Sequence, residues 1–241
     1  MSALLDRVVV RALGAAPGSG AAVRLEQRGQ IRLAPGKPWL PFRARQTLQA
    51  TAASFVWAAK VRMAPFTWVR IVDAFEQGRG HLEVRLWRLF PLADASGPEL
   101  DAGELLRYLA ELPWCPFAYR GNPDIEVQAT SETELSVRAS STRGTEEVIL
   151  TVDPSGDVVG VRAEARPRLV GREYRDLPWS GVFYDHGVLG GLRIPRRAAV
   201  TWHLDDGPFE CWRGEITALH LLPTSGKSGL HRNPAPPLRS L

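Results

Sequence analysis

Cysteine and histidine are scarce in this sequence, and long uncharged apolar stretches are missing. The 2 cysteines, Cys115 and Cys211, form no CxxC pair and the 5 histidines show no HxH or HxxxH spacing, so we expect no metal site. No stretch reaches the ~18 apolar residues of a membrane-spanning helix. Near the N-terminus, Asp6, Arg7 and Arg11 interrupt the apolar residues that a signal peptide keeps together. We therefore expect a cytoplasmic chain with reduced thiols that does not span a membrane.

An excess of charge of one sign is also missing outside the chain ends. The 30 basic and 26 acidic residues give a formal net charge of +4. Residues 223–241 carry basic residues without an acid, residues 1–22 carry one excess arginine, and the sequence between them is neutral. Because nucleic-acid binding needs a concentrated positive surface, we expect no nucleic-acid partner.

Alternation of apolar and polar residues is what the sequence has in abundance. From Phe55 to Met63 every second residue is apolar, while Lys60 and Arg62 are charged. A period of two is typical of strands with one buried face. In one alternating segment the pattern assigns Arg166 to the polar face, away from the core. The alternating segments are 23–33, 55–63, 69–75, 82–86, 126–129, 135–138, 147–152 and 159–166, and less regularly 180–188, 193–204 and 209–221.

Two segments of the chain predict helices, residues 3–13 and 101–112. In the second, Asp101 and Glu104 resemble a capping box, and Pro113 stops the helix. Its leucines recur at a spacing of three and four residues, which gives the helix an apolar face. We therefore expect this central helix to pack on the sheet.

The strands and turns together predict the fold class, which is mainly β with few helices. About eleven or twelve strands with turn residues at 153–156 and 205–207 indicate an antiparallel sheet, and so wide a sheet must curl because strand twist accumulates. We expect one domain over 3–222, a curved open half-barrel around the central helix with an N-terminal helix. The Pro-, Gly- and Ser-rich segment 223–241 predicts a disordered basic tail.

Several motifs resemble, in order and spacing, those of one bacterial family. They are Gln27-Arg-Gly29, Trp39-Leu-Pro-Phe42, Phe55-Val-Trp57-Ala-Ala59, Gly78-Arg-Gly80, Arg107-Tyr-Leu-Ala-Glu111-Leu-Pro-Trp114-Cys-Pro116, Val152-Asp-Pro-Ser-Gly156, Pro178-Trp-Ser-Gly181 and Gly191-Leu-Arg-Ile-Pro195. The family is known only as a domain of unknown function. The resemblance implies the fold of lipoprotein carriers, in which an open half-barrel of antiparallel strands cups helices and sometimes a lipid.

Asp73 is a charged residue that the alternation places on an apolar face, between Ile71 and Phe75. An ionised carboxylate there needs a partner, because burial of a lone charge costs several kcal/mol. One interpretation makes Asp73 a polar group inside a ligand cleft. The other makes it a strand-end residue that accepts hydrogen bonds from the turn Gly78–Gly80.

Three charged residues of the predicted central helix, Glu104, Arg107 and Glu111, share the face opposite the leucines. As a solvated stripe they would stabilise the helix by only ~0.2–0.5 kcal/mol per pair. If the sheet cups the helix, they face the mouth of a cavity. Arg107 would then hold a carboxylate or phosphate head group, and Glu111 would orient it or act as a general base.

Sequence motifs that carry catalysis or bind cofactors are missing, since there is no GxSxG elbow, no phosphate-cradling loop and no dinucleotide-binding glycine spacing. Our principal hypothesis is a non-catalytic module, without a cofactor, for a lipid-like or hydrophobic small molecule. One alternative is a hydrolase or isomerase that uses Glu111 or Asp73 with Arg107. Another is a protein-interaction module that recruits a partner through a sheet edge or the basic tail. Tryptophans either line the pocket or pack the core, and the predicted ligand-binding residues are Asp73, Glu104, Arg107, Glu111, Trp57 and Trp114.

Overall fold

Thirteen strands form one antiparallel sheet in the computed structural model, which describes residues 2–14, 20–87 and 89–223. The sheet order runs from β6 down to β1, then from β13 down to β7, so the first and last strands pair at its centre. This confirms the predicted fold class. The strands are β1 (Ala22–Ile31), β2 (Leu40–Gln49), β3 (Phe55–Ala64), β4 (Thr67–Glu76), β5 (Arg79–Leu86), β6 (Phe90–Ala95), β7 (Ile125–Ala129), β8 (Glu134–Ser141), β9 (Gly144–Val152), β10 (Val158–Val170), β11 (Glu173–Leu189), β12 (Leu192–Leu204) and β13 (Gly207–Leu222).

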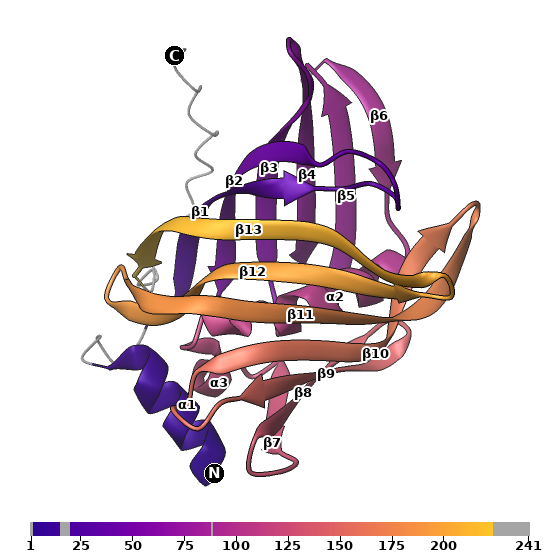
Figure 1. Cartoon of the computed structure of the whole chain (residues 1–241). Coiled ribbons are helices and arrows are strands. Elements are labelled where there is room, and N and C mark those ends of the chain that lie inside the picture. The colour runs from indigo at the N-terminus through magenta and orange to yellow at the C-terminus, as the bar shows by residue number, and fades with distance from the viewer. Residues whose placement is uncertain (1, 15–19, 88, 224–241) are drawn as a thin grey trace, which may run out of the picture.

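The sheet curls around helix α2 (Pro98–Ala110), as Figure 1 shows. Strands β2–β6 stand upright in this view, β10–β13 cross in front of them, and α2 lies between the two sets. The helix contacts β4 and β5 from the first set, β10 from the second set, and β8 and β9, which follow β10 in the order of the sheet. The inner faces of both halves of the sheet therefore meet on one helix. The remaining helices are α1 (Ala3–Leu13), the 3-10 helix η1 (Leu112–Trp114) and α3 (Ala118–Gly121).

The central helix begins and ends earlier than the capping-box pattern predicts. Gly97, with φ 128°, is its N-cap, and the helix ends at Ala110. Asp101 lies inside the helix, where its buried carboxylate accepts a hydrogen bond of 2.7 Å from the Gly80 amide and pairs with Arg79 at 3.1 Å. The capping prediction is wrong because contacts with a distant turn satisfy Asp101, and residue spacing along the helix does not reveal such contacts.

Two strands, β2 and β6, lie outside the alternating segments of the sequence. In β2, the buried residue Gln46 interrupts an apolar series formed by Phe42, Ala44 and Leu48. In β6, all residues but the last are exposed, so the strand has no apolar face. These two strands explain why the pattern predicts fewer strands than the sheet contains.

Other local predictions concern the turns, the N-terminal helix and the tail. The turns at 153–156 and 205–207 join β9 to β10 and β12 to β13, and Gly156 and Gly207 there have φ values of 91° and 113°. Helix α1 coincides with the predicted N-terminal helix. The predicted disordered tail falls, except for its first residue, outside the described residues.

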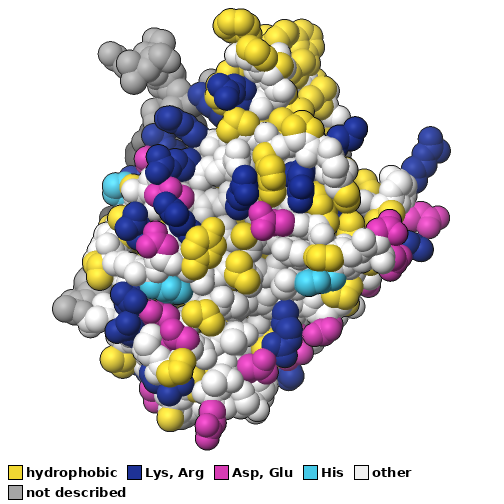
Figure 2. Space-filling view, viewed as in Figure 1, with side chains coloured by type: hydrophobic (Ala, Val, Ile, Leu, Met, Phe, Trp, Pro, Cys, Tyr) yellow, Lys and Arg dark blue, Asp and Glu magenta, His cyan; other side chains and the backbone are white. Residues whose placement is uncertain are grey.

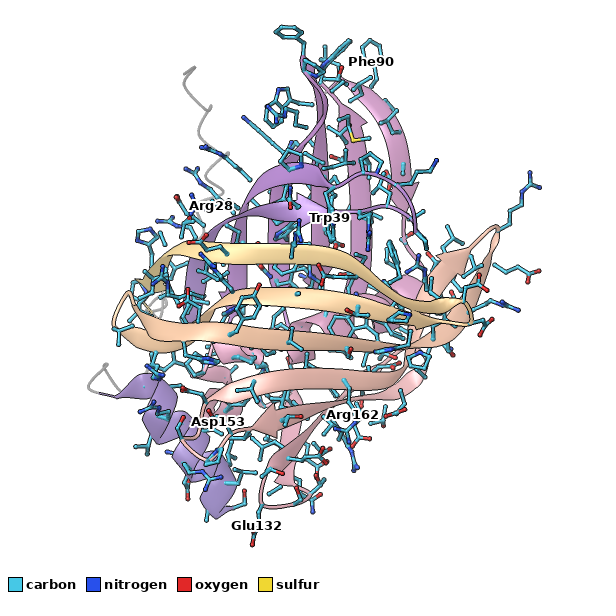
Figure 3. The ribbon with its side chains drawn as sticks, viewed as in Figure 1. Arg28, Trp39, Phe90, Glu132, Asp153 and Arg162 are labelled. Carbon is cyan, nitrogen blue, oxygen red and sulfur yellow. The ribbon has the colours of Figure 1, made fainter. Side chains whose placement is uncertain are left out.

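Large apolar side chains gather at the tips of the β3–β4 and β5–β6 hairpins, at the top of Figure 2. Phe66 is 91% exposed and Leu89 is 73% exposed. Phe90, labelled in Figure 3, belongs to the same tip. We call this group the apolar tip, and its members are Met63, Phe66, Trp68, Trp87, Leu89, Phe90 and Leu92.

Two further predictions concern the thiols, which we expect to be reduced, and the helices, none of which we expect to span a membrane. Cys115 is buried, Cys211 is partly buried, and both are free. Within residues 2–14, 20–87 and 89–223, no helix has both the length and the apolar character needed to cross a bilayer.

Candidate functional site

A cluster of buried charges lies between α2 and the inner face of the sheet. Arg107 on α2 is at its centre, with Nη1 in an ion pair with Asp73 on β4 and Nε donating to Glu111 Oε1 at 2.9 Å. Glu104 Oε2 lies 3.9 Å from the same Nη1. The exposed fractions are 16% for Arg107, 15% for Asp73, 14% for Glu111 and 8% for Glu104. The interpretation of this helix face as a solvated stripe is therefore wrong, because the sheet covers it.

Hydrogen bonds continue from Glu111 across three strands. Gln46 Nε2 on β2 donates to Glu111 Oε2, and Gln27 Nε2 on β1 donates to Gln46 Oε1 at 2.7 Å. Trp57 Nε1 on β3 then donates to Gln27 Oε1 at 2.8 Å. The guanidinium carbon of Arg107 lies 5.0 Å from the Trp57 ring centre. This series of bonds fixes both oxygens of the Glu111 carboxylate and ties α2 to three strands.

Burial and mutual repulsion set the charge state of the cluster. Burial, and then the neighbouring carboxylate of Asp73, raise the pKa of Glu104 to about 8, although Arg107 and Arg166 act against the shift. Glu104 is therefore mostly protonated at neutral pH. Burial by itself disfavours the charge on Arg107, but the carboxylates of Glu111 and Asp73 outweigh it and hold the pKa of the guanidinium above its ordinary value. The cluster is thus built around one permanent cation.

A cavity of about 310 Å³ opens beside the charged cluster, on the inner face of the sheet. Its walls include side chains of β10 to β13 and of α2. Five of the 8 tryptophans of the chain contribute to its lining, which makes it strongly aromatic. These are Trp57, Trp114, Trp179, Trp202 and Trp212.

Polar atoms without partners distinguish this cavity from two larger hollows of the described chain. Asp73 Oδ1, Arg166 Nε and Trp179 Nε1 are buried, belong to side chains of its lining and have no hydrogen-bond partner among the described residues. Two larger hollows, of about 540 and 900 Å³, have no such atom in their described linings. An unsatisfied buried polar atom costs ~1–3 kcal/mol, which a ligand that bonds to it can offset.

Arg166 lines this cavity because β10 contains a β-bulge. Ala163 pairs with Trp179 and Arg166 pairs with Leu177, so one extra residue of β10 lies between the two pairs. The extra residue reverses the alternation, which leaves Ala165 exposed and turns Arg166 inward. The prediction that Arg166 lies on the polar face is therefore wrong.

The predicted ligand-binding residues come together at this cavity. The two tryptophans, the aspartate, one charged residue of α2 and the glutamate at the C-cap of α2 line it, and Glu104 adjoins them through Arg107. Whether they bind a ligand stays a prediction. The five lining residues are Asp73, Arg107, Glu111, Trp57 and Trp114.

The alternative role of Asp73 is contradicted. Its carboxylate pairs with Arg107, and the turn Gly78–Gly80 bonds instead to Asp101. A Cβ at position 80 would lie 2.5 Å from the Leu100 carbonyl oxygen, so glycine there allows β5 to approach α2 closely. Asp73 is thus an inward residue of mid-strand, as its place in the alternation indicates.

The sequence interpretation missed four residues of the site, Gln27, Gln46, Arg166 and Trp179. Gln27 is a polar residue on the apolar face of an alternating strand, which is the signal that singles out Asp73. Gln46 gives the same signal within β2. Arg166 gives none, because a bulge is invisible in the residue pattern.

The donor set of the site does not suit a metal ion. Among the described residues, no three or more His, Cys, Asp or Glu side chains are grouped so that they could hold one.

Both oxygens of Glu111 already accept hydrogen bonds, from Arg107 and Gln46, and so are poorly placed to remove a proton. The arrangement is therefore an aromatic cavity with fixed charges along one side.

Comparison with solved structures finds two distant likenesses. The chain is similar to a LolA superfamily protein from Nitrosomonas europaea, with 14% identity and a TM-score of 0.46 over 92% of this chain and 93% of that chain. It is also similar to a DUF1329 family protein from Desulfovibrio piger, with 11% identity and a TM-score of 0.49 over 94% of each chain. At these identities the likenesses concern the fold alone.

Sequence comparison gives the family directly. No curated protein is significantly similar to the chain. The model of one family of unknown function, DUF6544, matches residues 15–214, which is most of the chain and includes every residue of the charged cluster. This confirms the resemblance inferred from the motifs. The chain belongs to the DUF6544 family.

Proposed function

We propose that this protein is a non-catalytic module that binds a lipid-like or otherwise hydrophobic small molecule between the sheet and α2. The observation that carries the proposal is the tryptophan-lined cavity of about 310 Å³. Ligand pockets typically measure ~300–1,000 Å³ and combine apolar walls with a few fixed polar groups. The cavity lies at the small end of this range, which favours a short or medium acyl chain.

The contacts of the charged cluster favour binding over catalysis. A general base needs a free lone pair within reach of its substrate, and Glu111 has both oxygens engaged. Arg107 already pairs with Asp73 and Glu111, so it is better placed to hold the site together than to clamp a head group. The enzyme alternative therefore has weaker support than the binding module.

Native mass spectrometry of protein freshly isolated from cells, followed by titration with decanol, tests the proposal. Five cavity tryptophans supply an intrinsic fluorescence signal for the titration. The expected results are a co-purified hydrophobic ligand or saturable uptake of decanol. A bare chain mass together with no change in fluorescence would overturn the proposal.

A pair of valine variants locates the binding. Val200 lines the cavity from β12, and Val200→Phe should reduce decanol uptake by filling it. Val182 is its matched control, since it lies on the outer face of the adjacent strand and is 53% exposed. Val182→Phe should leave uptake unchanged. Equal effects of the two variants would argue against binding in this cavity.

A protein-interaction module is the second candidate, and the apolar tip is the observation that favours it. Exposed aromatic and aliphatic side chains gathered at hairpin ends are typical of association surfaces. Analytical ultracentrifugation of the full chain and of a Phe66→Ser/Leu89→Ser variant tests self-association through this tip. A higher mass for the parent chain only would support it, and a monomer for both would contradict it. Cytoplasmic location stays a prediction.

A further inference from the structure

Arg166 is a cavity arginine without a partner. Within the described residues its side chain forms no ion pair and no hydrogen bond, and its Nε is buried and unsatisfied. Arg107, on the same cavity, contacts three carboxyl groups. Burial lowers the pKa of Arg166, and repulsion by Arg107 acts in the same direction. A buried cation in this condition is stabilised by any anion that reaches it.

The Arg166 guanidinium lies over two aromatic rings. Its central carbon lies 4.9 Å from the Trp179 ring centre and 5.4 Å from that of Trp202. These contacts hold the side chain by cation–π attraction and leave its N–H edge without a protein partner. A guanidinium edge offers parallel donors, which match the paired oxygens of a carboxylate or phosphate.

The same arrangement of rings and guanidinium groups continues away from Arg166. Arg168, two residues further along β10, lies 5.0 Å from the Trp202 ring centre and 5.2 Å from that of Phe209. Arg32 follows, at 5.1 Å from Phe209 and 4.7 Å from Trp39, which Figure 3 labels. Neither Arg168 nor Arg32 has an ion pair with a described carboxylate, and Arg32 instead donates to a backbone carbonyl. This row of positive groups favours the approach of an anion toward the cavity.

We propose that the cavity ligand is an amphiphile whose oxyanion head group, a carboxylate or a phosphate, is bound by the N–H edge of Arg166. This inference rests on the proposed hydrophobic-binding function and adds the chemical class of the ligand. The unsatisfied Trp179 Nε1 is a second donor of the same lining. Asp73 Oδ1 repels an anion, so the head group lies on the Arg166 side and the apolar chain lies along the tryptophans.

Calorimetric titration with three ligands of equal chain length tests the head group. Decanoate and decyl phosphate carry an oxyanion and distinguish its two sources, while decanol carries none. The unaltered full chain should bind at least one of the acids about tenfold or more tightly than the alcohol. Arg166→Met should lose that preference, so that its affinities for the acids and for decanol differ by no more than about twofold, because the cation that pairs with the acid head group is removed.

Two further variants distinguish the specific loss of the Arg166 guanidinium from the general effect of removing an arginine from β10. Arg162→Met is the matched control, because Arg162 lies on the outer face of the same strand, pairs with Glu134 and is labelled in Figure 3. It should bind like the parent. Arg166→Lys keeps the charge but loses the paired donors, so its acid affinity should lie between those of parent and Arg166→Met. It also serves as the test variant if circular dichroism shows that Arg166→Met does not fold.

The results test separately the hydrophobic-binding function, the acidic head group and the role of Arg166. If neither acids nor alcohol bind, the hydrophobic-binding function itself fails. If decanol binds as tightly as both acids, that function stands and the acidic head group is overturned. An acid preference that survives in the Arg166 variants, or that disappears equally in Arg162→Met, would overturn the role of Arg166.

Discussion

Arg107 acts at the scale of a single residue, as the partner of three carboxyl groups from β4 and α2. Its side chain is 16% exposed, so the charges it compensates have little access to water. Removal of one member of a buried ion pair destabilises the fold far more than replacement of all its members by apolar residues, because the remaining buried charge is left uncompensated. The sequence identifies this arginine, whereas its role in holding α2 to the sheet follows from the contacts.

The Arg107→Met substitution tests this structural role. It should lower the free energy of unfolding by ~3–5 kcal/mol, because Asp73 and Glu111 would both lose their counter-ion. Urea unfolding monitored by circular dichroism measures the change. Arg120→Met, at an exposed ion pair with Asp6, is the control and should change it by less than ~1 kcal/mol. Similar losses for both variants would contradict a central role for Arg107.

Glu104 predicts an unusual dependence of stability on pH. Its pKa is about 8 in the folded chain and ordinarily 4.5, so unfolding releases a proton at pH values between these limits. Stability contributed by the protonated group should therefore fall as pH rises from about 4.5 to about 8, by at most ~1.4 kcal/mol per pH unit.

Unfolding curves recorded across this pH range compare Glu104→Gln with the parent chain. The variant keeps the neutral shape without the titration, so its stability should decline less steeply and exceed that of the parent at pH 8. Glu76→Gln, at an exposed site, should follow the parent profile. A parent profile that rises through the same range, with no flattening in Glu104→Gln, would contradict the assignment.

At the scale of elements, strands decide the faces on which residues lie, and a single irregularity reverses them. The bulge in β10 moves Arg166 from the predicted polar face to the cavity. The hairpin tips show a second effect, because the ends of the β3–β4 and β5–β6 hairpins leave apolar residues exposed to solvent, at the top of Figure 2. Whether a side chain is buried therefore depends on its position along the strand as well as on the face of the strand to which it belongs.

Two phenylalanines at opposite ends of β4 test this dependence. Phe75 is 2% exposed and Phe66, just before the strand, is 91% exposed. Phe75→Ala should lower the free energy of unfolding by ~3–5 kcal/mol through loss of burial and creation of a cavity. Phe66→Ala should change it by no more than ~0.5 kcal/mol. Chemical denaturation measures both, and a large loss at Phe66 would show that the tip is packed in solution.

At the scale of the whole molecule, the first helix of the chain is bonded to its second half. Arg11 on α1 pairs with Asp157 at 3.2 Å, and Arg193 on β12 pairs with the same carboxylate at 2.7 Å. Burial opposes the ionised form of Asp157, but hydrogen bonds from Arg193 and Arg11 outweigh it and lower its pKa to about 2. One carboxylate thus joins the N-terminal helix to the sheet.

Acid titration tests the contribution of Asp157. Because the pKa of Asp157 in the folded chain lies below its ordinary value of 3.8, its stabilisation is present above about pH 4 and is lost as pH falls toward 2. Asp157→Asn should lower stability by ~1–3 kcal/mol at neutral pH and remove this acid-dependent part. Hydrogen exchange should then be faster in α1 than in α2. Unchanged exchange in α1 would show that the ion pairs do not hold that helix.

Residue patterns along the chain are sufficient to predict the fold class, the turns at 153–156 and 205–207 and the placement of Asp73 on an apolar face. Strand periodicity and turn chemistry can be predicted because both depend on residues that are close together in the sequence. The sequence also brought forward six residues of one site, since polar residues on apolar faces are visible in the pattern. The start of α2 was wrong by three residues because Asp101 is satisfied by a turn that lies 21 positions away in the chain.

Tertiary structure alone decided which charges are paired and which are free. Residue type marks Arg107 and Arg166 as equivalent cations, yet the first contacts three carboxyl groups and the second lies over two indole rings. The difference arises from the curl of the sheet, which brings β4 and β10 to one helix, and from one extra residue in β10. Both are long-range outcomes of packing, because the free energy of a buried charge depends on neighbours that are distant in the sequence.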